Sequence, residues 1–233
     1  NATIAAVCYD IRVAGVLVTK ANKDNVLGTP EGTNPTVTFQ PAGDDPATLT
    51  LNNATIDLRD VEGSGICYTG TTALTIKLIG TNSIQTQYNC EPILCDLVSD
   101  TKPSLTFEVG SRPCSLELVT GGYTSVIKNF SSVNGVNNIN GKTGNSLMLS
   151  NNEALYNADN GLYTIVDQEF VSVSSAMIID FYGITVAGVP VRDGNIDNVL
   201  GTTTPTVSFA PAVPATDDTP ATQAVLTLDG ATL

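Results

Sequence analysis

"ALTIKLIG", residues 73–80, alternates apolar and polar side chains over most of its length and ends in a glycine. This alternation has the period of a β-strand, in which successive side chains point to opposite faces of a sheet. Related triplets begin at Leu49 (LTL) and Leu105 (LTF), at similar intervals before and after Leu74. A strand that recurs in this way is typical of a β-solenoid, in which stacked coils share one core.

A second set of strands lies between these triplets at similar intervals. Its members are "GICYTG" (65–70), "PILCDLV" (92–98) and "SVIKNF" (125–130). Two strands in each repeat predict stacked coils over residues 49–130, because a single coil cannot bury its own inward face. The side chains expected to point inward are Leu49, Leu51, Leu74, Ile76, Leu105 and Phe107.

The composition of the whole chain favours an all-β fold. Of its 233 residues, 42% are hydrophobic and only 14% are charged, so the polar surface must come largely from Thr, Asn, Ser and Gly. Those residues suit strands and turns better than charged amphipathic helices. The alternative to a solenoid is a pair of tandem β-sandwich modules, which are about 100 residues long.

One phrase occurs twice in the chain. "YDIRVAGVLVTKANKDNVLG" (9–28) returns as "YGITVAGVPVRDGNIDNVLG" (182–201), with thirteen of twenty positions identical. The match continues in two further pairs of segments: "PTVTFQPA" (35–42) with "PTVSFAPA" (205–212), and "LTLNNATI" (49–56) with "LTLDGATL" (226–233). The spacing from Tyr9 to Tyr182 does not match a series of sandwich modules.

These matches divide the chain into one full repeat and the head of another. Residues 1–181 form the first repeat, with a strand-rich head module at 9–56 followed by coils to about residue 181. Residues 182–233 form the second, truncated head. We expect this second head to be an ordered end piece in which Tyr182 and Val186 have the same environments as Tyr9 and Val13, because open solenoid ends invite aggregation.

The first head and the coil motifs resemble a recurrent module of gut Bacteroidota and related anaerobes. The resemblance rests on the phrase at 9–28, the "TLTLNNATI" strand and the coil segment "LTIKLIGTNSI", and covers residues 9–130 and 182–233. Proteins of this kind are described as carbohydrate-binding domain-containing. The resemblance implies a right-handed parallel β-helix, a secreted or cell-surface location, and for some relatives calcium-dependent binding of acidic plant polysaccharides.

The charge of the chain bears on its partners. The net charge is −13, which repels the phosphate backbone of nucleic acids. No uninterrupted apolar run reaches the roughly 18 residues that span a bilayer, so membrane insertion is not expected. The chain opens at Asn1 without a methionine and is interpreted as a processed or truncated product from which a leader could have been removed.

The five cysteines have two interpretations. The chain has no histidine and no CxxC pair, so a zinc site is poorly supported. Burial of the thiols as small hydrophobic groups is the favoured interpretation. The alternative is one disulfide, either Cys67–Cys95 or Cys90–Cys95, with Cys67 and Cys95 expected in one column on neighbouring coils.

Two loops carry residues that could bind calcium. "NKDN" (22–25) and "NIDN" (195–198) place Asn22 and Asp24, and again Asn195 and Asp197, close together in one loop. Such oxygen ligands suit calcium. The same residue types also close turns through bonds between the side chain and the backbone, and this second role is the favoured one. No other cofactor is expected.

Glycan binding would use aromatic side chains, and the chain has no tryptophan. Tyr68, Tyr88 and Tyr123 lie near predicted coil corners and are the candidates for a sugar platform, although ordinary packing explains tyrosines at such places as well. Catalysis is not expected, because the tightest charged cluster, Asp57 with Arg59 and Asp60, is explained by a surface ion pair.

Two functional hypotheses follow. The leading one is a non-catalytic extracellular or cell-surface β-solenoid that binds glycans or mediates adhesion. The alternative is a structural subunit of an extracellular fibre or surface array, assembled from copies of the chain through end-to-end β contacts.

Overall fold

The structure is a computed structural model, and it describes residues 7–30, 32–122, 124–137, 147–149, 155–156, 165–166, 175–213 and 220–232. Within these residues, the regular elements are β-strands apart from one short 3-10 turn, η1 (Asp193–Asn195). The all-β prediction is therefore confirmed. No helix in the described segments is long and apolar enough to cross a lipid bilayer.

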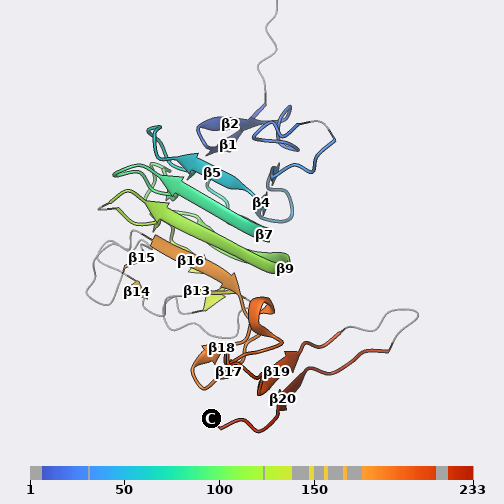
Figure 1. Cartoon of the computed structure of the whole chain (residues 1–233). Helices are drawn as coiled ribbons and strands as arrows, with labels where there is room; N and C mark the ends of the chain where they lie inside the picture. Colours follow the sequence, from blue (N-terminus) through green and yellow to red (C-terminus); the bar gives the residue numbers. More distant parts are fainter. Residues whose placement is uncertain are drawn as a thin grey trace, which may run out of the picture.

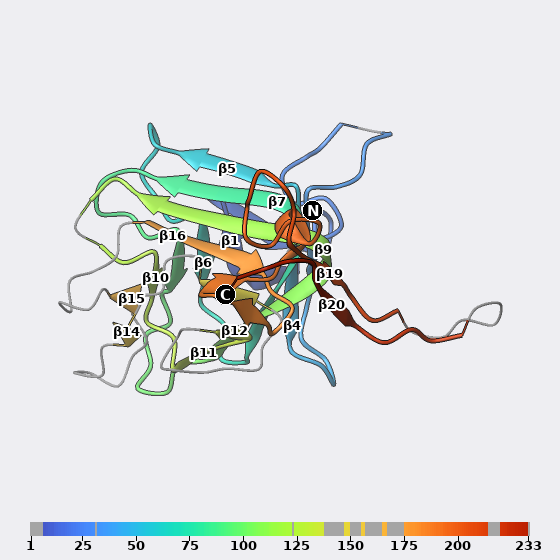
Figure 2. The same cartoon turned by 60° about the horizontal axis from the view of Figure 1, so that its bottom comes forward.

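The largest sheet has strand order β12-β13-β16-β9-β7-β4-β3, with β5 pairing with β7 and β11 pairing with β9 outside this order. Figure 2 shows β5, β7, β9 and β16 side by side along one wall of the molecule. The strands of this sheet are β3 (Val37–Gln40), β4 (Ala47–Asn52), β5 (Thr55–Leu58), β7 (Leu74–Thr86), β9 (Ser104–Thr120), β11 (Ser132–Asn134), β12 (Val136–Asn137), β13 (Leu147–Leu149) and β16 (Ser175–Asp180).

Parallel ladders run through this sheet and stack short repeats that begin at β4, β7, β9 and β11, which are distinct from the long repeat of residues 1–181. β4 pairs in parallel with the first half of β7, which pairs in parallel with the first half of β9. β5 pairs in the same way with the second half of β7, and this half continues the ladder to β9. The predicted inward residues are all buried in one core: Leu49, Leu51, Leu74, Ile76, Leu105 and Phe107.

The ladder confirms that the triplets stack, but corrects their register. Leu74 lies opposite Leu105, as the triplets predict, whereas Leu49 lies opposite Ile76 and not opposite Leu74. The first repeat interval thus runs from Leu49 to Ile76, slightly longer than the triplets predict. A shift of two residues keeps Leu49 on the inward face, because side chains alternate with a period of two.

A second sheet closes another side of the same core, with strand order β10-β8-β6-β1-β2. β6, β8 and β10 pair in parallel and correspond to the second set of predicted strands. Glu91, before β8, accepts hydrogen bonds from Thr124 Oγ1 at 2.6 Å and Lys128 Nζ at 2.7 Å, which tie neighbouring repeats together. The strands are β1 (Cys8–Val13), β2 (Val16–Thr19), β6 (Ile66–Tyr68), β8 (Ile93–Cys95) and β10 (Ile127–Lys128).

The register of this second sheet overturns the predicted cysteine column. Cys95 lies opposite Tyr68, and Cys67 lies opposite Leu94. An offset of one residue puts two side chains on opposite faces of a sheet, so Cys95 is buried while Cys67 is half-buried. Cys67, Cys90 and Cys95 carry free thiols in the structure. The burial prediction holds for Cys95 and Cys114, but not for Cys8, which is exposed.

A polar corner joins the repeats where β7 bends. Asn82 is 1% exposed, and its Oδ1 accepts a hydrogen bond from the backbone N–H of Ala54 at 2.8 Å. Its Nδ2 lies 3.1 Å from the carbonyl oxygens of Ile79, Gly80 and Ser115. One amide therefore contacts the backbone of three successive repeats, which satisfies polar groups that would otherwise be buried without a partner.

After β11, which still pairs in parallel with β9, antiparallel pairing appears in this sheet. β16 pairs antiparallel with the second half of β9 on one side and with β13 on the other. β14 (Leu155–Tyr156) and β15 (Ile165–Val166) form a small antiparallel pair. The predicted coils between residue 138 and residue 174 lie outside the described residues, except for β13, β14 and β15.

The two heads lie at opposite ends of the structure (Figure 1). The first contains β1 to β4. The second contains two hairpins, β17 (Thr185–Val186) with β18 (Val189–Pro190), and β19 (Val207–Ala210) with β20 (Val225–Leu228). Its buried residues form a separate small cluster around Val191 and Phe209. The division of the chain at residue 181 stays a prediction.

Candidate functional site

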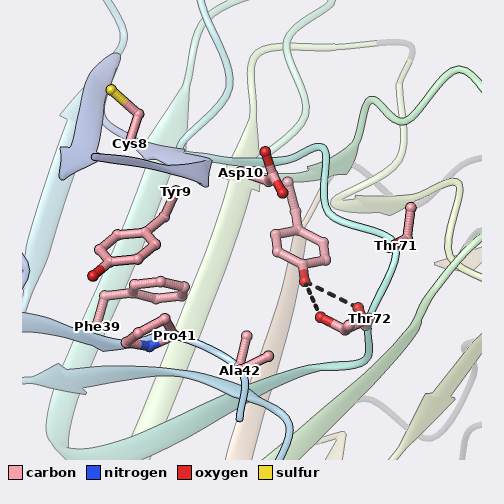
Figure 3. Close-up of a pocket in the computed structure, with 10 residues that line it drawn as sticks. Cys8, Tyr9, Asp10, Phe39, Pro41, Ala42, Thr71 and Thr72 are labelled. Atoms are coloured by element: carbon pink, nitrogen blue, oxygen red, sulfur yellow. Dashed lines mark hydrogen bonds between the residues drawn. The ribbon is translucent and has the colours of Figure 1, made fainter. Parts of the chain in front are cut away.

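A pocket of about 290 Å³ lies where the first head meets β6 and the loop that follows it. Figure 3 shows the ring of Tyr9 above that of Phe39 along one side of it, with Thr72 on the opposite side. Asp10 lies at the top of the view. The centroids of the two rings are 5.4 Å apart and the rings are tilted by 50°. The pocket thus combines an aromatic wall with a carboxylate and hydroxyl groups, at the lower end of the size range of small-molecule sites.

Tyr68 lines this pocket but is not the exposed platform that the sequence suggests. The residue is 2% exposed, and its hydroxyl lies 3.0 Å from both the carbonyl oxygen and the Oγ1 of Thr72. Burial raises the pKa of this hydroxyl. Tyr68 therefore offers no exposed ring face, and its contact with a sugar stays a prediction.

The other two tyrosines do not complete a platform within the described residues. Tyr88 is 55% exposed, and its ring lies against Gly122, where a Cβ atom would come within 2.9 Å of the ring. Tyr123 lies outside the described residues. Of the three candidates, the structure therefore exposes the ring of Tyr88 and buries that of Tyr68.

The predicted calcium ligands close turns. The backbone N–H of Thr19 donates to Asn22 Oδ1 at 2.7 Å, and that of Arg192 donates to Asn195 Oδ1 at 2.9 Å. The carboxylate of Asp24 is exposed and forms an ion pair with Lys23 Nζ at 2.6 Å. The turn interpretation thus describes both asparagines.

Asp197 is exposed on the loop that follows η1. No group of three potential metal-binding acidic or cysteine side chains occurs among the residues that the structure describes. Calcium binding at either loop therefore stays a prediction.

The last asparagines of the quoted NKDN and NIDN segments, Asn25 and Asn198, shape the same loops, and the sequence pattern did not assign them a bonding partner. Asn25 brackets Thr29 by accepting from its backbone N–H at 2.8 Å and donating to its carbonyl at 2.9 Å. Asn198 does the same to Thr202, at 3.2 and 2.7 Å. The identity of Asn25 and Asn198 in the two copies is the signal that could have found them.

Asp57 and Arg59 form an exposed ion pair, with Arg59 Nη2 at 2.6 Å from Asp57 Oδ2. Hydrogen bonds from the side chain and backbone of Arg59 lower the pKa of Asp57 to about 2. The carboxyl group is therefore ionised at neutral pH, which does not suit a general acid.

The two heads have the same internal structure. Tyr9 packs on Phe39 as Tyr182 packs on Phe209, where the ring centroids are 5.1 Å apart and tilted by 51°. Val13 and Val186 are both buried. The predicted equivalence is confirmed for the packing of the tyrosine ring and for the burial of the valine.

The strand pairing within the heads matches as well. β3 pairs with β4 through Val37 opposite Leu51, and β19 pairs with β20 through Val207 opposite Leu228. Both pairs are antiparallel and have the same register along their length. The second head is therefore a folded copy of the first, and not a loosely attached extension.

The heads differ in what covers their last strand. In the first head, Leu49 and Leu51 are both 0% exposed and belong to the large core, where β7 lies beside β4. Their counterparts in the second head, Leu226 and Leu228, are 39% and 52% exposed. Among the described residues, β20 pairs only with β19. We call Val225, Leu226 and Leu228 with the outer edge of β20 the open edge.

A polar joint fastens the second head to the stack. Arg112, on β9, donates to Asp180 Oδ2 at 3.2 Å and to the carbonyl of Phe181 at 3.0 Å. Its guanidinium lies 4.3 Å from the ring centroid of Tyr182, and the Tyr182 hydroxyl donates to Asp193 at 2.6 Å. Burial and the bond to Asp193 raise the pKa of Tyr182 to about 12. The second head thus packs on the preceding strands, as predicted, and leaves the open edge uncovered.

Comparison with known proteins adds no relative to this description: no family model, no curated protein and no solved structure matches the chain.

Proposed function

We propose that the protein is a non-catalytic structural module of an extracellular fibre or surface array, joined end to end through β-strand contacts. The observation that carries the proposal is the open edge. The two leucines of the Leu-Thr-Leu triplet are fully buried in the first head and exposed in the second, although the two heads fold alike. An exposed strand edge with apolar side chains is a template for another strand.

The proposal includes a right-handed parallel β-helix as the fold of residues 49–130. It is supported by parallel ladders on separate walls of one core, β4 with β7 and β9, and β6 with β8 and β10. Tandem β-sandwich modules fit less well, because their sheets are antiparallel. The secreted or cell-surface location rests on the resemblance of the head phrase to carbohydrate-binding domain-containing proteins.

We expect the isolated chain to associate through the open edge as its concentration rises. The exposed parts of Leu226 and Leu228 provide apolar area whose burial favours association. The measurement is sedimentation velocity from micromolar to millimolar chain, comparing the wild type with a chain carrying Leu226→Asp and Leu228→Asp.

The matched control carries Val61→Asp and Val98→Asp, which add the same two charges at exposed valines away from β20. This control should associate like the wild type, whereas the open-edge variant should stay monomeric. Near-ultraviolet circular dichroism of the Tyr182–Phe209 pair reports whether the second head still folds. A wild-type chain that stays monomeric throughout would contradict the proposal.

Glycan binding is a second candidate function, and the pocket beside Tyr9 favours it. Aromatic rings bind the apolar faces of sugars, and Asp10 with Thr71 and Thr72 supplies exposed polar groups for their hydroxyls. Because the chain has a net charge of −13, an acidic glycan would need a bridging cation, and calcium is the candidate.

On a glycan array, we expect neutral glycans to bind without calcium and acidic glycans to bind only with it. Asp10→Asn with Thr71→Ala should weaken binding about tenfold or more, because hydrogen bonds to a charged group contribute about 1.5–3 kcal/mol. Asp44→Asn with Thr33→Ala, on exposed loops outside the pocket, is the control. No reducing ends should be released. Equal binding by all three chains would remove the pocket from consideration.

A further inference from the structure

We infer that the open edge receives a parallel strand of the β7 type, carried by a further repeat unit. This inference rests on the proposed function and names the partner of the same site. The first head supplies the precedent, because its β4 pairs on one edge with β3 and on the other with β7. β20 has the β3-type partner, β19, and the β7-type partner is what it lacks within the described residues.

The equivalence of the two heads fixes the register of the incoming strand. Leu226 corresponds to Leu49, which lies opposite Ile76, and Leu228 corresponds to Leu51, which lies opposite Leu78. The incoming strand therefore places one apolar side chain beside each exposed leucine. Its outward residue between them, which corresponds to Lys77, lies beside Thr227.

The backbone beyond β20 is already shaped for this partner. In the first head, Asn53 has a positive φ of 50° and its N–H donates to the carbonyl of Ile79 at 3.0 Å. Gly230 occupies the same place in the second head, with φ of 65°. The next N–H, that of Ala54, is bound by Asn82 Oδ1, so the incoming strand should present an asparagine to Ala231. The partner is thus an apolar-Thr-apolar-x-apolar strand followed by an asparagine at the place of Asn82.

A second copy of this chain does not present such a strand on its surface, so association of the isolated chain pairs two open edges in place of this partner. β7 is paired along one edge with β4 and β5 and along the other with β9. The first head also covers the first repeat through β1, which pairs with β6. The occupant is therefore the coil strand of a further repeat whose own edge is uncovered.

The test uses the full chain and a synthetic peptide of residues 72–86, "TALTIKLIGTNSIQT". Cysteine pairs report the register, because a disulfide needs Cα atoms within about 7 Å. The chain carries Cys8→Ser, to remove an exposed thiol, and either Thr227→Cys or Val225→Cys. The peptide carries Thr75→Cys, Lys77→Cys or Ile79→Cys.

The parallel register predicts two disulfides. One joins position 227 of the chain to position 77 of the peptide, and the other joins position 225 of the chain to position 75 of the peptide. Each should form about tenfold faster than the pair 225 with 79, which an antiparallel strand centred on residue 77 would favour. Adding Leu228→Asp to the chain should abolish both, and adding Asn82→Ala to the peptide should slow both. Dominance of the pair 225 with 79, or no disulfide at all, would overturn the inference.

The outcome also separates this inference from the proposed function. If the wild-type chain associates through Leu226 and Leu228 but does not capture the peptide, the β7-type partner is wrong and the structural role stands. If the chain captures the peptide but stays monomeric, the β7-type partner stands and the association of identical copies is wrong. If the chain neither associates nor captures the peptide, both are wrong.

Discussion

A chain that carries Leu74→Asp is expected not to fold. Leu74 is 0% exposed and lies between Ala47 and Leu105 on the two neighbouring strands. The substitution removes a buried leucine side chain, which alone costs about 2–5 kcal/mol, and puts a carboxylate in an apolar site. The sum is comparable with the whole stability of a domain, about 5–15 kcal/mol. Circular dichroism should show no cooperative thermal transition.

Thr50→Asp is the matched control for this substitution. Thr50 lies on the outward face of β4, opposite Lys77, so an aspartate there adds the same charge beside a cation and near solvent. Its cost should be about 1 kcal/mol or less, because strand propensities and outward cross-strand pairs act on that scale. A Leu74→Asp chain that melts cooperatively near the wild-type temperature would show that Leu74 does not belong to a shared core.

The ladders could be predicted from the sequence because alternation and recurrence are both local patterns. The alternating leucines specify which side of a strand faces inward, and every predicted inward residue is buried. The register between Leu49 and Ile76 could not be predicted in the same way. It depends on the length of the whole segment between β4 and β7, and strands shifted by two residues have identical patterns.

Short strands carry too little information to separate inside from outside. β6 has only three residues, so Tyr68 and Cys67 could each have faced the core. The structure buries the tyrosine and half-buries the cysteine. The cysteine column is wrong for this reason, because Cys67 lies opposite Leu94 and not opposite Cys95. An exposed Tyr68 ring would also have required the opposite face of β6.

The open edge shows a different limit of sequence reasoning. Leu226 and Leu228 have the same pattern as Leu49 and Leu51, and the pattern correctly predicts a strand with one apolar face. Burial, however, depends on whether a neighbouring strand is present, and the residues of β20 do not encode that. The joint at Arg112 was missed for a similar reason, since it is made by one side chain far along the chain from Tyr182.

Replacing Asn82 by leucine should destabilise the protein by about 3–5 kcal/mol, because several buried polar groups lose a partner at once. Leucine has nearly the same size, so the effect isolates the polar contacts of the corner. The N–H of Ala54 and the carbonyl of Ser115 would lose their bonds to this side chain, and each buried group left without a partner costs about 1–3 kcal/mol. The loss should appear as a lower midpoint in urea with an unchanged slope, because the surface exposed on unfolding stays the same.

Asn53→Gly, at the same corner, separates this bridging role from a general need for asparagine in the turn. Asn53 is exposed, and its side chain accepts only one backbone bond, from Thr81 N–H at 3.1 Å. Its φ of 50° suits glycine, which the second head has at the equivalent position, Gly230. The substitution should therefore cost about 1 kcal/mol or less. If Asn82→Leu costs no more than Asn53→Gly, the buried amide does not hold the repeats together, and their stability comes from the apolar core alone.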